Sequence, residues 1–207
     1  MKKLFIITGV IFFFYCCNNL TDNKKTGTSK SDVQEYFNEV VTNTEFDTSN
    51  HTISKWEKDV RIFVKGTKKQ DLMVELDSIV SELNLLIDPI DIKIVNKESD
   101  ANLVLFFGSP EGFTKLYPNL KPYMEENWGL FEIFGSEEIT SGRIFVDIVR
   151  CKSLTGQKHV LREELTQSLG FCNDSYSYPE SIFYQDWTET TEYAQIDKEI
   201  IKMLYNK

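Results

Sequence analysis

The sequence has only two histidines, His51 and His159, among its 207 residues. A catalytic zinc ion needs three protein ligands, and a three-histidine set is therefore excluded. The Gly-x-Ser-x-Gly turn of many hydrolases, the phosphate-binding P-loop and the Gly-x-Gly-x-x-Gly loop of dinucleotide-binding proteins are also missing. These absences remove the commonest zinc, serine-nucleophile and nucleotide enzymes from consideration.

Positive charge is in deficit, with 23 Lys and Arg residues against 32 Asp and Glu residues and a formal net charge of −9. Removal of the leader described below would take away Lys2 and Lys3 and no acidic residue. Proteins that bind nucleic acids present basic patches to the phosphate backbone. We therefore expect no nucleic-acid partner.

Long hydrophobic runs are scarce, and the main one spans residues 4–15, directly behind Lys2 and Lys3. A run of this length is too short to cross a bilayer, which takes about 20 apolar residues. A basic start followed by a short apolar segment is typical of a signal peptide. The sequence therefore predicts an exported protein.

The end of this leader predicts a lipid anchor. No Ala-x-Ala cleavage site follows the apolar run, whereas Cys16 and Cys17 come directly after it. A cysteine in this place is where lipoprotein processing attaches diacylglycerol. We predict a lipoprotein signal over residues 1–17, acylation of Cys17 or Cys16, and a membrane-anchored protein of the bacterial cell envelope. An ordinary signal peptide is the alternative, because Phe14 and Tyr15 are bulky for this position.

The rest of the chain divides into a tether and one domain. Residues 18–31 are polar and hold almost no apolar side chains, so they are predicted to form a flexible tether. Residues 32–207 have the length of a single domain with a sizeable core. Cys151 and Cys172 are its only cysteines. An oxidising compartment would permit a disulfide, but these residues are expected at opposite ends of a helix about 20 Å long, which argues against one.

Apolar periodicity predicts an alternation of helices and strands. A first helix follows Ser31 as its candidate N-cap, a second spans 72–83, and a last one carries Ile196, Ile200 and Leu204. The predicted strands cover 60–64, 90–94, 101–107, 129–134 and 143–149, and the stretch 112–128 is predicted as an ordered loop. This order indicates an α+β domain.

A helix near residue 163 carries the most informative pattern. The metallopeptidase signature H-E-x-x-H-x-x-G-x-x-H, aligned on this segment, places Glu163 at the first ligand, Glu164 at the general base and Gln167 at the second ligand. Gly170 then falls at the turn and Asn173 at the third ligand. The segment thus resembles a zincin motif in which only the glutamate base is kept.

The resemblance extends beyond this helix. Ser181-Ile182-Phe183-Tyr184 resembles the Met-turn of zincins, with Phe183 at the methionine position. The region from His159 to Tyr205 looks like a zincin-like bacterial domain family of unknown function found in exported proteins, with the pattern E-E-x-x-Q-x-L-G followed by N-D-S. The resemblance implies a zincin-like mixed sheet, a motif helix and a small C-terminal helical subdomain. An unrelated α+β domain with a coincidental motif is the alternative.

The polar face of the motif helix indicates what the site can hold. On a helical wheel His159, Glu163 and Gln167 share one face, opposite Leu161, Leu165 and Leu169. Gly170 would turn the chain back and bring Asn173 and Asp174 to this face. Such an oxygen-rich pocket suits Mg²⁺, Ca²⁺ or no metal better than Zn²⁺, so no cofactor is the expectation. A solvated helix face would show the same pattern.

Aromatic residues follow the motif, and two interpretations stay open for them. They form the core of the C-terminal part, or they line the cleft as a stacking surface for a glycan or a peptide side chain. The residues are Tyr176, Tyr178, Phe183, Tyr184 and Trp187. Phe183 and Tyr184 are the cleft candidates among them.

The function that fits these patterns is a lipid-anchored, non-catalytic binding or accessory module with a degenerate metallopeptidase site and a peptide or protein partner. The resemblance implies that the strand 129–134 is an edge strand beside the motif helix, open to an extended peptide. Two alternatives are kept: a peptidase-like hydrolase with a carboxylate-based centre and Glu164 as general base, and a purely structural surface lipoprotein.

Overall fold

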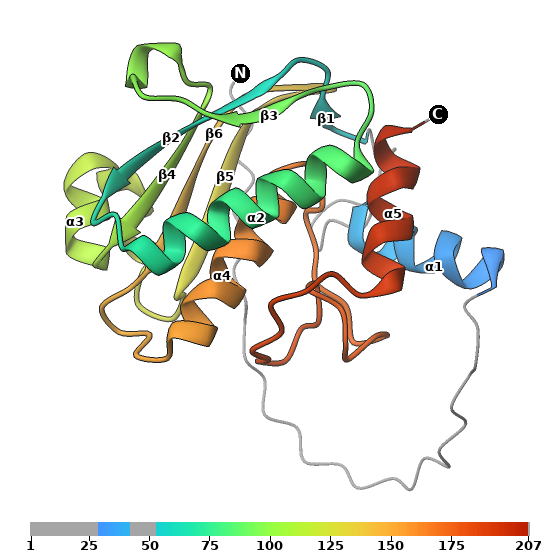
Figure 1. Cartoon of the computed structure of the whole chain (residues 1–207). Coiled ribbons are helices and arrows are strands. Elements are labelled where there is room, and N and C mark those ends of the chain that lie inside the picture. The colour runs from blue at the N-terminus through green and yellow to red at the C-terminus, as the bar shows by residue number, and fades with distance from the viewer. Residues whose placement is uncertain (1–28, 42–52, 207) are drawn as a thin grey trace, which may run out of the picture.

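The computed structural model describes residues 29–41 and 53–206 (Figure 1). The predicted leader, Cys16, Cys17 and most of the predicted tether lie outside these residues. Within the two ranges, none of the helices combines the length and apolar composition that crossing a bilayer would require.

Six described strands form one mixed sheet in the order β1-β6-β4-β2-β3, with β5 paired to β6. Their neighbours run parallel except for β5, which is antiparallel to β6. The strands are β1 (Lys55–Trp56), β2 (Val60–Gly66), β3 (Ile92–Ile94), β4 (Leu103–Gly108), β5 (Gly129–Gly135) and β6 (Glu138–Asp147). The strand β5 therefore lies at an edge of the sheet, as predicted.

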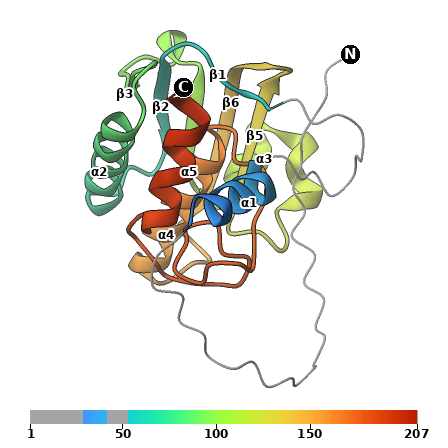
Figure 2. The same ribbon diagram turned by 90° about the vertical axis from the view of Figure 1, so that its right-hand side faces the viewer.

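Helices cover both faces of this sheet. The α-helices are α1 (Lys30–Val41), α2 (Gln70–Leu86), α3 (Pro110–Leu116), α4 (Leu154–Gln167) and α5 (Gln195–Tyr205), and the 3₁₀ helices are η1 (Glu98–Asp100) and η2 (Pro118–Tyr123). The helices α2 and α4 lie side by side on one face (Figure 1), and α1 packs against α5 (Figure 2). The predicted α+β fold class, with its motif helix and C-terminal helical part, is confirmed.

The alternation of side chains along the strands separates two cores. Ile62, Leu105 and Ile144 face α2 and α4 and belong to the larger core. Phe106 and Phe145 point to the other face, where they pack with residues of α3 and η2 in a smaller core. The motif helix is thus fixed against the centre of the sheet by apolar contacts.

Several predicted boundaries are corrected. The stretch 112–128, predicted as a loop, contains the end of α3 and all of η2. Ser109 caps α3 by accepting a hydrogen bond from Gly112 N–H, and Pro110 occupies the first turn. The strand β6 begins at Glu138, five residues before the predicted start, and the short β1 was not predicted.

The start of α1 also differs from the prediction. Ser29, not Ser31, caps this helix, because its hydroxyl accepts from Asp32 N–H at 3.2 Å while Asp32 Oδ2 accepts from Ser29 N–H at 3.0 Å. The helix therefore begins at Lys30, among the last residues assigned to the tether. Cys151 and Cys172 are both free, as the expected geometry required.

Candidate functional site

The motif helix α4 has the two faces that its sequence predicts. Leu161, Leu165 and Leu169 are fully buried in the larger core. Ser153 caps the helix by accepting from Gly156 N–H at 3.1 Å. Gly170 follows the helix with a φ of 121°, and a side chain there would collide with the carbonyl oxygen of Ser54. The glycine thus turns the chain back over the polar face.

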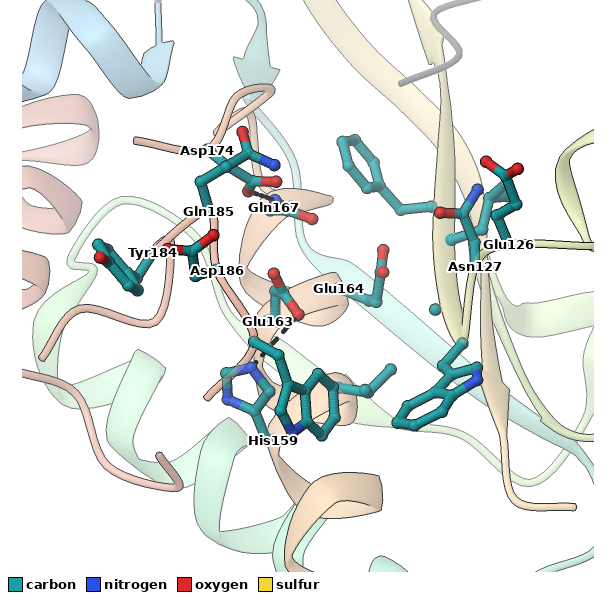
Figure 3. A pocket seen from close by; sticks show the side chains of 16 residues that line it. Glu126, Asn127, His159, Glu163, Glu164, Gln167, Asp174, Tyr184, Gln185 and Asp186 are labelled. Carbon is teal, nitrogen blue, oxygen red and sulfur yellow. Dashed lines mark hydrogen bonds and ion pairs between the residues drawn. The ribbon is translucent and has the colours of Figure 1, made fainter. Parts of the chain in front are cut away.

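A cleft of about 260 Å³ lies over this polar face (Figure 3). It is bounded by α4, by the beginning of β5 with the loop before it, and by the segment between α4 and α5. We call it the acidic cleft, and its lining residues are Glu126, Asn127, Trp128, Gly129, Leu130, Phe131, His159, Val160, Glu163, Glu164, Gln167, Asp174, Tyr184, Gln185, Asp186 and Trp187.

Most of the predicted site residues meet in this cleft. His159, Glu163, Glu164 and Gln167 all line it from α4. Gln167 Nε2 donates to Asp174 Oδ1 at 2.6 Å, which joins the helix to the returning chain (Figure 3). The predicted approach of the chain after Gly170 is therefore present.

Asn173, aligned with the third metal ligand, does not line the acidic cleft. Its side-chain amide donates to Glu39 O at 3.3 Å, and its backbone N–H donates to Val40 O at 3.1 Å. These bonds fasten the segment to α1 and turn Asn173 away. Asp174, one residue later, lines the cleft instead of Asn173.

The residues of the motif do not fit a zinc centre. The Gln167 amide donates a hydrogen bond to Asp174, and the Asn173 amide donates one to Glu39 O in α1. Among residues 29–41 and 53–206 no group of three or more His, Cys, Asp or Glu side chains is arranged to hold a metal ion. The absence of a metal cofactor stays a prediction.

His159 is held in one tautomer at the wall of the cleft. Its Nδ1 lies 2.8 Å from the carbonyl oxygen of Thr190, which can only accept, so Nδ1 carries a proton. Nε2 lies 3.6 Å from Glu163 Oε2. Burial lowers the pKa of His159, so the ring is neutral at neutral pH and gives Glu163 no positive partner.

The two adjacent glutamates lie in a setting that favours their protonated forms. Burial, followed by the nearby carboxylates of Asp174 and Glu164, raises the pKa of Glu163 well above its ordinary value. Burial and then Asp174 raise the pKa of Glu164 in the same way. Glu164 is 8% exposed, and its Oε2 has no hydrogen-bond partner. Glu164 thus lines the cleft with a buried carboxyl group, one oxygen of which has no donor among the described residues.

Gly129 at the start of β5 makes room for this carboxyl group. A Cβ atom at this position would overlap Oε1 and Cδ of Glu164 and would lie 2.6 Å from Val160 Cγ1. Only glycine lets the edge strand and the helix approach so closely. The sequence reasoning missed this role, because the contact joins segments far apart in the chain.

The edge of β5 is open to the cleft only at its beginning. Asp147 N–H donates to Trp128 O at 2.7 Å, so the alternation of an antiparallel pair directs the backbone groups of Gly129, Phe131 and Ile133 away from β6. Phe131 and Ile133 are only 6% and 3% exposed, however. The accessible end of this edge is therefore Trp128 and Gly129, and peptide binding at the edge stays a prediction.

Two tryptophans form a rim at the cleft. Trp128 and Trp187 are 39% and 52% exposed, and their rings meet edge to face with centroids 5.0 Å apart. Trp187 also contacts the His159 ring at 5.4 Å. Trp128 was not identified from the sequence, because its place depends on how the loop before β5 folds.

The other aromatic residues of the segment divide between core and cleft. Phe183 is fully buried and packs on Phe171 at 5.2 Å, so its assignment as a cleft residue is wrong. Tyr178 packs on Tyr36 in the larger core. Tyr184 lines the acidic cleft, as predicted.

The loop that carries Trp128 is fixed by a buried ion pair. Asp147, fully buried, pairs with Arg150 and also accepts from the backbone N–H groups of Val149 and Arg150. The Arg150 guanidinium then donates to the carbonyl oxygens of Glu125 and Asn127 at 2.9 and 2.5 Å. This arginine therefore organises the rim of the cleft from outside it.

Comparisons with known proteins place the chain in a family and go no further. Residues 30–207 match the family described as "Protein of unknown function (DUF2927)", and the chain belongs to it. No curated protein matches the sequence. Two solved structures, "Crystal structure of myroilysin" and "Structure of Myroilysin", are each 11% identical with a TM-score of 0.45. They cover 82% and 88% of this chain and 95% and 98% of their own. At this level the likeness says nothing about chemistry.

Proposed function

We propose that this member of the DUF2927 family is an exported, membrane-anchored binding module whose acidic cleft holds one side chain of a peptide or protein partner without cleaving it. The single observation that carries the proposal is the Glu164 carboxyl group. It is buried and lacks a partner for Oε2, and it faces a cleft that solvent can enter. An unpaired buried carboxyl group costs free energy, which a bound ligand would recover.

The size and the borders of the cleft support a peptidic ligand. A volume of about 260 Å³ is small for a cofactor and suits a single side chain. The backbone N–H and C=O of Gly129 point away from β6 at the mouth of the cleft. They would hydrogen-bond the backbone of a partner whose side chain enters between β5 and α4.

The side chains at the metal positions support binding without hydrolysis. Gln167 is tied to Asp174, and Asn173 is tied to α1, so neither is available to activate a water through a metal ion. Peptide hydrolysis at neutral pH depends on such activation in the zincin scheme. The cleft can therefore hold a side chain, while Gln167 and Asn173 are not placed to activate a water.

Tryptophan fluorescence tests the binding function. The chain has three tryptophans, and Trp56 is buried away from the cleft, so a ligand-dependent change reports on Trp128 or Trp187. We expect saturable changes with short peptides, lost when Trp128 and Trp187 are both replaced by Phe. Leu85→Gln, an exposed change on α2, serves as control. The proposal fails if no peptide in a library that varies one central residue changes the emission.

The anchor is tested separately in cells. Replacing Cys16 and Cys17 together by Ser should move the protein from the detergent phase to the aqueous phase. Retention in the detergent phase would show that the protein is attached in another way, without affecting the proposal for the cleft.

A carboxylate-based hydrolase is the second candidate, and one observation favours it. Carboxyl groups that hold their protons above the usual range are typical of acid–base catalysts, and both Glu163 and Glu164 have raised pKa values. In this case Glu164→Gln would abolish a measurable peptide turnover and leave binding intact. Binding without turnover in the wild-type protein, from pH 4 to pH 8, would exclude this candidate.

A further inference from the structure

Carboxyl side chains converge on the acidic cleft from every element that borders it. They belong to α4, to the loop before β5 and to the segment between α4 and α5. The carboxyl groups that line the cleft are Glu126, Glu163, Glu164, Asp174 and Asp186. The described lining contains no lysine and no arginine. The charged side chains of the lining that the structure describes are therefore all acidic.

Two arginines near this site are committed elsewhere. Arg162 precedes Glu163 but points to α2, where it pairs with Glu75 and Glu82 at 2.9 and 2.8 Å. Arg150 is paired with Asp147 behind the rim. Neither guanidinium lines the cleft, so neither neutralises its carboxyl groups.

Glu164 distinguishes the cleft from an ordinary acidic surface. Exposed carboxylates are solvated and need no partner, whereas Glu164 is 8% exposed and its Oε2 has no donor. A buried carboxyl group in such a setting is satisfied by a donor that comes from outside the protein. The strongest donors for a carboxylate are cationic N–H groups.

The rim favours the same kind of ligand. The faces of indole rings attract cations, and Trp128 and Trp187 stand half-exposed at the entrance. Their edge-to-face arrangement leaves apolar surface for the methylene groups of a long side chain. An ammonium or guanidinium group on an alkyl chain matches both the rim and the floor of the cleft.

We infer that the acidic cleft recognises a lysine or arginine side chain of the partner, with its charged group at Glu164 and Glu163 and its alkyl chain against the exposed surfaces of Trp128 and Trp187. This inference rests on the proposed binding function and names its ligand class. The ligand supplies a counter-charge that the described lining does not contain. A cationic side chain pairs with the buried carboxylate, whereas an uncharged side chain leaves it unpaired. The cleft is therefore selective for charge.

Binding of a cation should be linked to release of protons. The ligand stabilises the ionised carboxyl groups, so affinity rises with pH as these groups lose their protons. The titratable groups that face the cleft are Glu126, His159, Glu163, Glu164, Asp174, Tyr184 and Asp186. The glutamates of α4 dominate the effect, since burial raises the pKa of both.

Matched peptides test the charge requirement. Acetylated and amidated pentapeptides with four alanines and a central lysine, arginine, norleucine or glutamate differ only in that side chain. Isothermal titration should show the lysine and arginine peptides binding at least about tenfold more tightly than the norleucine peptide, which corresponds to about 1.4 kcal/mol. Glu164→Gln should reduce this preference to about onefold, whereas Glu57→Gln, an exposed acid outside the cleft, should leave it unchanged.

Each outcome separates the inference from the proposed function. Equal affinity for lysine and norleucine peptides would overturn the charge inference while the binding function stands. No binding of any peptide would overturn both. Stoichiometric binding of Ca²⁺ or Mg²⁺ that depends on Glu164 and excludes the lysine peptide would replace the inference with a metal site. If Glu164→Gln does not fold, Glu126→Gln at the exposed rim should still weaken lysine binding about twofold to threefold.

Discussion

Two buried charged clusters lie on α4 one residue apart, and they are built in opposite ways. In the first, Arg162 is 2% exposed, pairs with Glu75 and Glu82, and stacks over the Tyr193 ring at 4.6 Å. In the second, Glu163, Glu164 and Asp174 line the acidic cleft, whose described lining contains no lysine or arginine. Opposite charges are matched in one cluster, and like charges are gathered in the other.

The difference separates charges that support the fold from charges for which we propose a ligand. The Arg162 cluster joins α4 to α2 and uses the strong donors of the guanidinium on two carboxylates. Among the described residues, the carboxyl groups of the acidic cleft form no such ion pair with a guanidinium group. Instead, burial and then the neighbouring carboxylates raise the pKa of Glu163. Such a cluster does not stabilise the fold, and for this reason we propose that a partner completes it.

The largest effect is expected from breaking the matched cluster. Arg162→Met leaves Glu75 and Glu82 without their main partner beside a buried helix, and it should lower the free energy of unfolding by about 3–5 kcal/mol. Urea denaturation followed by circular dichroism measures this loss. Lys158→Met, which removes the longer 3.4 Å contact to Glu75, should cost about 1 kcal/mol or less. Equal losses in the two variants would contradict the role of Arg162.

A smaller effect is expected from closing the space beside Glu164. Gly129→Ala places a methyl group against the Glu164 carboxyl and Val160, and overpacking of this kind costs about 1–3 kcal/mol. It should also weaken binding of the lysine peptide, because the carboxyl group must move. The double variant with Glu164→Ala should recover part of the stability. Full additivity of the two changes would show that the contact does not matter.

The smallest effect is a gain in stability from the unmatched cluster. The folded-state pKa of Glu163 lies above its unfolded value of about 4.5, so the folded state holds more protons, and stability falls as the pH rises through this window. Glu163→Gln removes the contribution of this carboxyl group to the fall in stability. The variant should therefore be more stable than wild type at pH 8, by on the order of 1 kcal/mol, and no more stable at pH 4. A loss of stability at pH 8 would contradict the repulsion.

The sequence predicts the faces of α4 well, because a helix places residues at fixed intervals. Leu161, Leu165 and Leu169 lie in the core, and His159, Glu163 and Gln167 line the cleft. The segment after the helix is less predictable. Asp174 replaces Asn173 in the cleft because the backbone and side chain of Asn173 bond to α1, which is distant in the sequence.

The remaining differences have similar physical causes. The strand β6 continues through Thr140, Ser141 and Gly142, which resemble a turn in sequence. Ser141 and Gly142 pair with β5, and the register shifts at the bulge beside Thr140. The start of α3 could have been predicted, since Ser109 and Pro110 form a standard helix start. The contact of Gly129 with Glu164 and the place of Trp128 could not, because they depend on how the loop before β5 packs.

The central claim is that the acidic cleft holds buried carboxyl groups without a cation until a ligand brings one. Carbon-13 NMR titration of the glutamate carboxyl groups, assigned with Glu163→Gln and Glu164→Gln, tests it most directly. In the free protein both groups should titrate well above the ordinary value of 4.5, and the lysine pentapeptide should lower both midpoints while the norleucine pentapeptide leaves them unchanged. Midpoints near 4.5 in the free protein, unmoved by the lysine peptide, would contradict the claim.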